Sequence, residues 1–332
     1  MPLNAKMIGA LSAFFTVKNF TDVILSLPKP ATPMTDLLFP KNKRRQLTSP
    51  YIAVADVQEE TGAVPVVVRG TQSFSVDGDK RSLGLIEVMP LSMNRVLLAS
   101  ELNNLVAMGM TDGLNAKLTE ISENLRDRTS TSTEILVCQA LSGNIAYPAR
   151  TEGGGNDTYQ VELGTLKSLA AASLTDASSM GDLQKALEAQ YIEQQLTGAS
   201  SDVRFLAGVD AYALVVALAT KASGAVPIQW TDYGCVLFGK YKIQAVSGTY
   251  KTPGSSAITE VIEAKSMQTV DLANTGKLFY AALDEFDARV QPLPFFATYE
   301  YQSDPSRVKV ISSSKPLPAF AVSKSTIKKY LA

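Results

Sequence analysis

The amino-acid sequence predicts an α+β fold in which one long helix separates extended segments from a compact α/β unit. Residues 111–142 contain no proline and repeat apolar side chains at helical spacing. Prolines recur in the first 50 residues and again near the C-terminus, which favours extended backbone there. From residue 166 to residue 290, short β-branched runs alternate with helical patterns. We therefore expect two core-bearing units, or one core with long excursions.

The long helix is predicted over Thr111–Ser142, where it would form a rod about 45 Å long. Asp112 is its candidate N-cap and Gly143 its candidate stop. The alternative is two short helices broken at Thr129–Thr133, because Thr and Ser have low helix propensity. Four apolar residues share one face of the predicted helix: Leu114, Leu118, Ile121 and Leu125.

The first 50 residues are predicted to form an arm with one short helix or strand, followed by extended chain. The arm has too many large apolar groups to bury alone, so we expect it to lie on another surface of the same chain or of a neighbour. The basic cluster Lys41–Arg45 is interpreted as a solvated loop, with contact to an acidic partner as the alternative. The basic C-terminal end around Lys324, Lys328 and Lys329 is expected to be frayed.

A long two-stranded hairpin is predicted over Ala63–Met89, with a turn at Asp77–Asp79 and a preceding strand at Tyr51–Val57. A lone hairpin is marginal in water unless one face is covered, and its edges can pair with other strands. It is either an edge hairpin packed on its own domain or a loop that reaches over a neighbouring subunit.

The rest of the chain is predicted from periodicity and turn signals. The sequence TEGGGND is interpreted as a hairpin turn, because it lacks the residues of a phosphate-binding loop. Lys315–Pro318 is expected to end the last strand pair, and Asp210 to cap a helix. The predicted strands are 144–149, 158–163, 203–207, 228–238, 241–246, 258–262, 295–301 and 308–311, and the predicted helices are 178–196, 211–222 and 274–288.

The composition excludes several classes of function. The chain has 332 residues, net charge −1 and no histidine, which rules out histidine bases, Ser-His-Asp triads and histidine-ligated metals. Cys138 and Cys235 are interpreted as buried reduced thiols. No stretch is long and apolar enough to span a membrane. Asp284, Glu285 and Asp287 are interpreted as exposed helix carboxylates, so we predict no catalytic, cofactor-binding or metal-binding residue.

Two short motifs and the order of the elements resemble a known family. The motifs are VVRGTQSFSVDGDKRSLGLIEV at Val67–Val88 and SDPSRVKVISSSKPLP at Ser303–Pro318. They resemble the R-G-x-[ST]…F and D-P-x-[RK]…S-x-P-L elements of the major capsid protein E family of lambda-like tailed phages. The resemblance implies the Hong Kong 97-type capsid fold, with an N-terminal arm (1–50), an E-loop hairpin with flanking strands (51–94), a peripheral domain with a spine helix (95–165), an axial domain (166–290) and a C-terminal return into the peripheral domain (291–332).

The resemblance also implies a function and partners. Copies of the chain would assemble as pentamers and hexamers in the host cytoplasm into the icosahedral head of the virion, with a scaffolding protein and a portal, and with double-stranded DNA bound non-specifically inside. It leaves open whether a decoration protein binds and does not predict covalent crosslinking. The alternatives are a tail ring or tube, an encapsulating compartment, or an enzyme that uses Lys or carboxylates. The hairpin residues expected to contact a neighbouring subunit are Val68, Arg69, Phe74, Asp77, Lys80 and Arg81.

Overall fold

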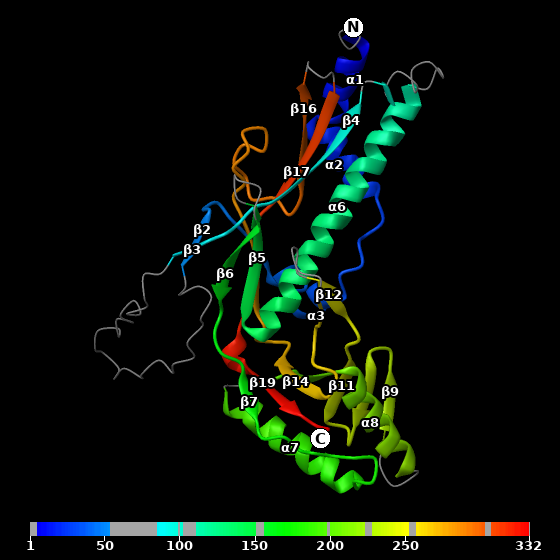
Figure 1. Cartoon of the computed structure of the whole chain (residues 1–332), viewed down its shortest axis with the longest axis vertical. Helices are drawn as coiled ribbons and strands as arrows, with labels where there is room; N and C mark the ends of the chain where they lie inside the picture. The colour runs from blue at the N-terminus through cyan, green and yellow to red at the C-terminus, as the bar shows by residue number, and fades with distance from the viewer. Residues whose placement is uncertain are drawn as a thin grey trace, which may run out of the picture.

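The structure is a computed structural model that describes residues 5–53, 85–98, 100–101, 111–150, 156–197, 200–222, 228–251, 257–302 and 307–331. The body is elongated, with the N-terminal helices at one end and the C-terminus near the other (Figure 1). Helix α6, Thr111–Ser142, runs obliquely through it as one unbroken helix, as predicted. The fold is a mixture of helices and sheets, which confirms the α+β class.

The polar middle of α6 stays helical because its hydroxyl groups bond within the helix. Thr129 Oγ1 donates to Leu125 O at 2.9 Å, and Thr133 Oγ1 donates to Thr129 O at 2.9 Å. Both threonines are buried, so these bonds remove the cost of unpaired hydroxyls. The alternative of two helices is therefore wrong. The helix begins at Thr111, so Asp112 is helical and not its N-cap.

Gly143 ends α6, as predicted. Its φ is +91°, a conformation that residues with a side chain rarely adopt. A Cβ atom there would lie 2.3 Å from Gly164 O, which no rotation could relieve. The stop is therefore set both by backbone conformation and by the close approach of the segment that follows β6.

The upper part of the body joins the N-terminal arm to α6 and a sheet. Helices α1 (Ala5–Phe14) and α2 (Val17–Ser26) lie beside the antiparallel sheet β16-β17-β4 (Figure 1). The strands are β4 (Leu91–Leu98), β16 (Phe296–Gln302) and β17 (Arg307–Ser314). Up to residue 26 the arm thus has two helices where one short element was predicted, further regular elements follow where extended chain was predicted, and the arm packs on its own chain. The shared core consists of Leu11, Phe14, Phe20, Leu97, Leu118, Ile121, Leu125, Ala297, Val308 and Val310.

A second core lies around the C-terminal half of α6. It contains the three-stranded sheet β1-β15-β18 and the antiparallel pair β5–β6; the turn predicted between these two strands falls largely on residues 151–155, outside the described residues. Its elements are α3 (Pro33–Leu38), the 3₁₀ turn η1 (Lys41–Lys43), β1 (Arg44–Leu47), β5 (Asn144–Arg150), β6 (Asn156–Glu162), β15 (Gly276–Ala281), β18 (Pro316–Phe320) and the 3₁₀ turn η2 (Val322–Lys324).

One prediction fails in this second core and one is confirmed. The helix expected at 274–288 is strand β15, because Leu278–Ala281 are buried without a gap between β1 and β18. A strand covered on both faces shows a continuous apolar run, which periodicity alone cannot distinguish from a buried helix. Strand β17 ends at Ser314, so Lys315–Pro318 ends the β16–β17 pair as predicted, although Pro316 also begins strand β18 at the edge of this sheet, which was not predicted.

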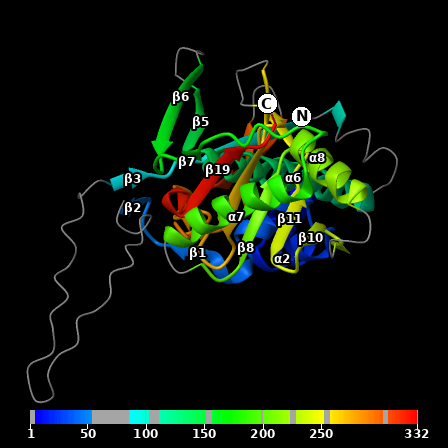
Figure 2. The ribbon, with the colours of Figure 1, turned by 90° about the horizontal axis from the view of Figure 1, so that it is seen from below.

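The lower part of the body is a seven-stranded sheet of order β7-β19-β14-β8-β11-β10-β9. Helices α7 (Met180–Leu196) and α8 (Val209–Lys221) contact each other on one face of it, in front of the strands in Figure 2. Phe205 and Ala207 face these helices, and Leu206 faces the second core. The strands are β7 (Lys167–Leu169), β8 (Val203–Ala207), β9 (Ile228–Thr231), β10 (Gly234–Leu237), β11 (Tyr241–Ala245), β14 (Ser266–Asp271) and β19 (Ser325–Lys329), and β12 (Thr249–Lys251) pairs with β13 (Ile258–Glu260) nearby.

Helix α7 begins at a capping box and α8 begins at a glycine. Ser179 Oγ accepts from Asp182 N, and the Asp182 carboxylate accepts from Ser179 N. The N-cap of α8 is Gly208, so the prediction of Asp210 is wrong. A Cβ atom at Gly208 would lie 2.2 Å from Glu263 O, so a capping residue with a side chain does not fit there.

The C-terminal end is an ordered strand and not a frayed terminus. Strand β19 lies between β14 and β7, and the side chain of Tyr330 is fully buried. Tyr330 Oη donates to Gln190 Oε1 at 2.8 Å, and Gln190 Nε2 donates to Met267 O at 3.0 Å. The buried amide of α7 thereby ties the last strand to the centre of the sheet.

The basic cluster Lys41–Arg45 is not simply a solvated loop. Lys43 Nζ donates to Leu272 O at 2.6 Å and to Thr275 Oγ1 at 2.8 Å. Arg44 pairs with Asp36 at 2.7 Å and also donates to Phe39 O at 2.9 Å. These cations hold η1 and β1 on the body, so they are used within the chain.

Candidate assembly surface

All six hairpin residues predicted to contact a neighbour lie outside the described residues. Val68, Arg69, Phe74, Asp77, Lys80 and Arg81 fall within 54–84, as does most of the predicted hairpin. The structure shows where this segment leaves and returns. Strand β2 (Tyr51–Ala53) pairs antiparallel with β3 (Leu85–Glu87), and the pair lies on one flank of the body (Figure 1).

The β2–β3 pair is a fixed base for the segment between its strands. Ile52 is 1% exposed and packs in the second core together with Val88. Val88 N also donates to Pro50 O at 3.2 Å, which extends the pairing by one bond. Residues 54–84 therefore start and end at a single anchored point, as a projecting loop requires.

Large apolar side chains remain exposed on several elements of the described chain. Scattered exposed apolar residues are normal, but large apolar side chains exposed by 40% or more mark candidate contact surfaces. Ile192 is among them and lies on α7. These residues are Leu25, Tyr51, Leu98, Ile192, Leu196, Val209, Trp230, Ile258, Phe286, Val290 and Tyr301.

The three acids proposed as exposed helix carboxylates lie in a loop between β15 and β16 and not in a helix. Each accepts a bond from a nearby strand or its flank. Asp284 accepts from Lys315 Nζ at 2.5 Å and Glu285 accepts from Ser313 Oγ at 3.1 Å. Asp287 accepts from Thr298 Oγ1 at 2.8 Å. Their partners are an ammonium and two hydroxyls, so they hold a loop in place and form no acid–base pair.

Two charged side chains of α6 hold the N-terminal arm. The Glu134 carboxylate accepts from Met34 N at 2.6 Å, Thr35 N at 2.9 Å and Thr35 Oγ1 at 2.5 Å. Arg126 donates to Ile24 O at 3.1 Å and to Pro28 O. Sequence reasoning missed both residues. The available signal was a charge on a helix whose neighbouring positions are apolar.

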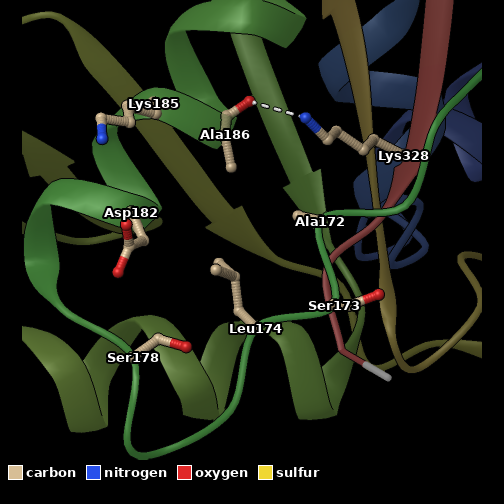
Figure 3. A pocket seen from close by; sticks show the side chains of 8 residues that line it. All are labelled: Ala172, Ser173, Leu174, Ser178, Asp182, Lys185, Ala186 and Lys328. Carbon is tan, nitrogen blue, oxygen red and sulfur yellow. Dashed lines mark hydrogen bonds between the residues drawn. The ribbon is translucent and has the colours of Figure 1, made fainter.

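An open pocket lies between α7, β19 and the segment 172–178 (Figure 3). Lys328 points across it and donates to Ala186 O at 3.3 Å, and burial lowers the pKa of its ammonium group. Asp182 also lines the pocket, but its carboxylate serves the capping box of α7. Lys185 points away from Lys328. The charged groups of the pocket are therefore one carboxylate, already used by the capping box, and the ammonium groups of Lys185 and Lys328.

Both cysteines are free and buried, as predicted. Burial, with a smaller effect of Glu134, raises the pKa of the Cys138 thiol to about 12, and burial raises the pKa of Cys235 to about 11. Within the described ranges, no three Cys, Asp or Glu side chains gather as a metal site would require. None of the helices described is long and apolar enough to cross a membrane.

Comparison with known proteins identifies a family and a fold. The family model for phage major capsid protein E matches residues 16–329. The crystal structure of a prophage capsid protein from E. coli CFT073 has a TM-score of 0.54 and 15% identity, over 99% of each chain. The capsid of cyanophage A-1(L) has a TM-score of 0.46 and 12% identity, over 92% of this chain and 94% of that one. The SrpI encapsulin of Synechococcus elongatus PCC 7942 has a TM-score of 0.43 and 8% identity, over 95% and 96%. No curated protein sequence gave a significant match.

Proposed function

The chain belongs to the phage major capsid protein E family and has the Hong Kong 97-type fold, and from this premise we propose how its surfaces build a shell. It is a structural protein of the virion, a major capsid protein whose copies assemble with one another. We propose that these copies form pentamers and hexamers that close into an icosahedral head around the phage genome, and that they assemble in the host cytoplasm without catalysing a reaction.

The anchored β2–β3 pair is the observation that carries this proposal. Its base is buried in the body, and the intervening segment carries Phe74, Arg69, Lys80 and other side chains proposed to contact a neighbour. A projecting strand pair offers both unpaired backbone groups and side chains to a second copy. The N-terminal arm does not need a second copy to bury its apolar side chains, because these already pack on α6 and β17 of the same chain.

We propose the division into arm (1–50), hairpin with flanking strands (51–94), peripheral domain (95–165), axial domain (166–290) and C-terminal return (291–332), with one change. Strand β19 pairs with β14, so we group Ser325–Lys329 with the axial domain. Strands β16 and β17 pair with one another and with β4, which supports their place in the peripheral domain.

The proposed partners beyond the chain itself are a scaffolding protein, a portal, packaged double-stranded DNA and, where the outer face is covered, a decoration protein. Family membership supports the first two. The net charge of −1 supports weak, non-specific contact with DNA, because a strongly basic chain would bind it tightly.

A hairpin replacement tests the proposal. Deleting Val68–Leu85, the segment that the sequence suggested, would remove Leu85 from its pairing with Ala53. A better variant replaces residues 58–80 with a short Gly-Ser linker and keeps both strands of the pair. We expect it to fold as wild type by circular dichroism and thermal melting, and to form no shells by electron microscopy.

Four other outcomes would contradict the proposal. Shells of normal size from the replacement variant would show that the hairpin is not needed for assembly. Loss of soluble folded protein would show that residues 58–80 belong to the internal core. Open rings or tubes from the wild type would favour the alternative of a tail protein, and shells without DNA in the native context would favour an encapsulating compartment.

A further inference from the structure

We infer that the loop Asp284–Val290, here called the Phe286 loop, is a preformed anchor that inserts the Phe286 ring into an apolar recess of a second copy of the chain. This inference rests on the proposed self-assembly and adds a specific contact to it. The loop lies between β15 and β16, outside the hairpin that the sequence suggested as the contact region.

The Phe286 side chain is 94% exposed, the highest fraction among the large apolar side chains of the described residues. Val290, at the end of the same loop, is 51% exposed. Leaving a phenylalanine ring in water forgoes the stabilisation that burial would give. Fully exposed aromatic rings on otherwise well-packed proteins are therefore candidates for burial against a partner.

The loop is held rigidly, so the ring has a defined position before any partner binds. Asp284 pairs with Lys315 at 2.5 Å, and the Lys315 side chain is only 4% exposed. The bonds of Ser313 to Glu285 and of Thr298 to Asp287 fix two further points. Within the loop, Arg289 N donates to Phe286 O at 2.9 Å and Val290 N donates to Glu285 O at 3.2 Å. Such preorganisation lowers the entropy cost of binding.

The backbone of the loop adopts a conformation that is rare for residues with large side chains. Arg289 has φ +52° and Val290 has φ +54°, the left-handed region that a β-branched residue such as valine rarely adopts. Glycine or asparagine would fit this turn at lower cost. Strain retained in an exposed loop is typical of a segment whose conformation serves binding.

The neighbouring charges indicate what the recess must look like. Asp284, which is 72% exposed, belongs to the same loop as Phe286, and so do Glu285, Asp287 and Arg289, so the charged groups of this loop are mostly acidic. An aromatic anchor inside a polar rim is the usual arrangement of an interface hot spot. The recess that receives it should be apolar at its centre and mostly basic at its edge.

The occupant we choose is a second copy of this chain. The chain is a subunit of a homo-oligomeric shell, so identical copies are the most abundant partners at every contact. Figure 1 draws the segment between β15 and β16 on the same side of the body as β2 and β3, so one neighbouring copy that covers this side would meet both. The hairpin and the Phe286 loop would then contribute to one continuous interface.

Replacement of Phe286 tests the inference. F286A should keep the circular dichroism spectrum and melting temperature of the wild type, because the ring makes little contact within the chain. It should raise the protein concentration needed for shell assembly at least about tenfold, as loss of a hot-spot aromatic does. F286W keeps a large aromatic ring and should restore assembly to within about threefold of wild type. Static light scattering measures both concentrations.

A photo-crosslinking phenylalanine analogue at position 286 identifies the occupant. In assembled shells it should join two copies of the chain, and mass spectrometry should place the bond at an apolar site with basic neighbours. Assembly of F286A at the wild-type concentration would overturn the inference alone. Crosslinks only to a different protein of the particle would overturn the choice of occupant. Wild-type protein that never assembles would overturn the proposed function, and the inference with it.

Discussion

Glu134 offers a direct test of how α6 holds the N-terminal arm. Its carboxylate accepts three bonds, from Met34 N, Thr35 N and Thr35 Oγ1, at 2.5–2.9 Å. It thus acts as an N-terminal cap of α3 supplied by another helix. Met34 and Thr35 are buried, so water cannot readily replace the lost acceptor in E134A.

The magnitude follows from these bonds. A hydrogen bond to a charged group contributes about 1.5–3 kcal/mol, and bonds that share one carboxylate are not additive. We therefore expect E134A to lower the free energy of unfolding by about 3–4 kcal/mol. E134Q keeps one acceptor oxygen and turns an amide NH₂ toward a donor, so about half of that loss should remain.

Urea unfolding followed by circular dichroism measures both changes. E120A on the same helix is the matched control, because Glu120 forms an exposed ion pair with Lys117, and the loss of such a surface pair should not move the urea midpoint measurably. An E134A protein less than about 1 kcal/mol below wild type would refute the reasoning, because it would mean that water reaches the start of α3. Equal losses of unfolding free energy in E120A and E134A would show that the effect comes from the charge on the helix and not from the bonds to α3.

Three further predictions follow from buried or locally bonded groups. Cys138 and Cys235, with raised thiol pKa values, should react with Ellman's reagent at pH 8 far more slowly in the native state than in urea. The reaction rates of the native protein should rise as the pH is raised toward 11. Fast labelling of the native protein at pH 8 would contradict the burial of the thiols. Y330F removes the hydroxyl that donates to Gln190 Oε1, so the free energy of unfolding in urea should fall by about 1–2 kcal/mol. No change would mean that water reaches the C-terminal strand at Tyr330. T131A on the exposed face of α6 should raise the free energy of unfolding by about 0.5 kcal/mol, measured by thermal melting, because alanine is the better helix former. A lower stability would mean that the bond from Thr131 Oγ1 to Asp127 O stabilises the helix.

Some features were readable from the sequence because their cause is local. Leu118, Ile121 and Leu125 predicted the buried face of α6, and Gly143 predicted its end. Strand β8 was predicted with its observed bounds, Val203–Ala207, from its short apolar run. The family was recognised from the order of elements and two motifs, which a linear chain displays directly.

The candidate contact surface was predicted only in part. The six hairpin residues stay a prediction, and the described β2–β3 pair supports their projection from the body. Phe286 was assigned to the apolar side of a helix, because Leu278, Leu283 and Phe286 fit a helical pattern. A sequence pattern gives the spacing of apolar residues but does not show which of them are buried by other elements. The exposed Phe286 ring therefore could not be distinguished from the buried side chains.

By itself the sequence determined the α+β class, the unbroken helix at Thr111–Ser142, the buried thiols and the exclusion of histidine chemistry. Only the tertiary structure decided that residues 276–281 form a strand, that the N-terminal arm packs on its own chain, and that Ser325–Lys329 joins the seven-stranded sheet. The reason is that helix periodicity and stop signals act between residues a few positions apart. Strand β15 depends on β1 and β18, and strand β19 depends on β14 and β7, and these partners come from distant parts of the chain.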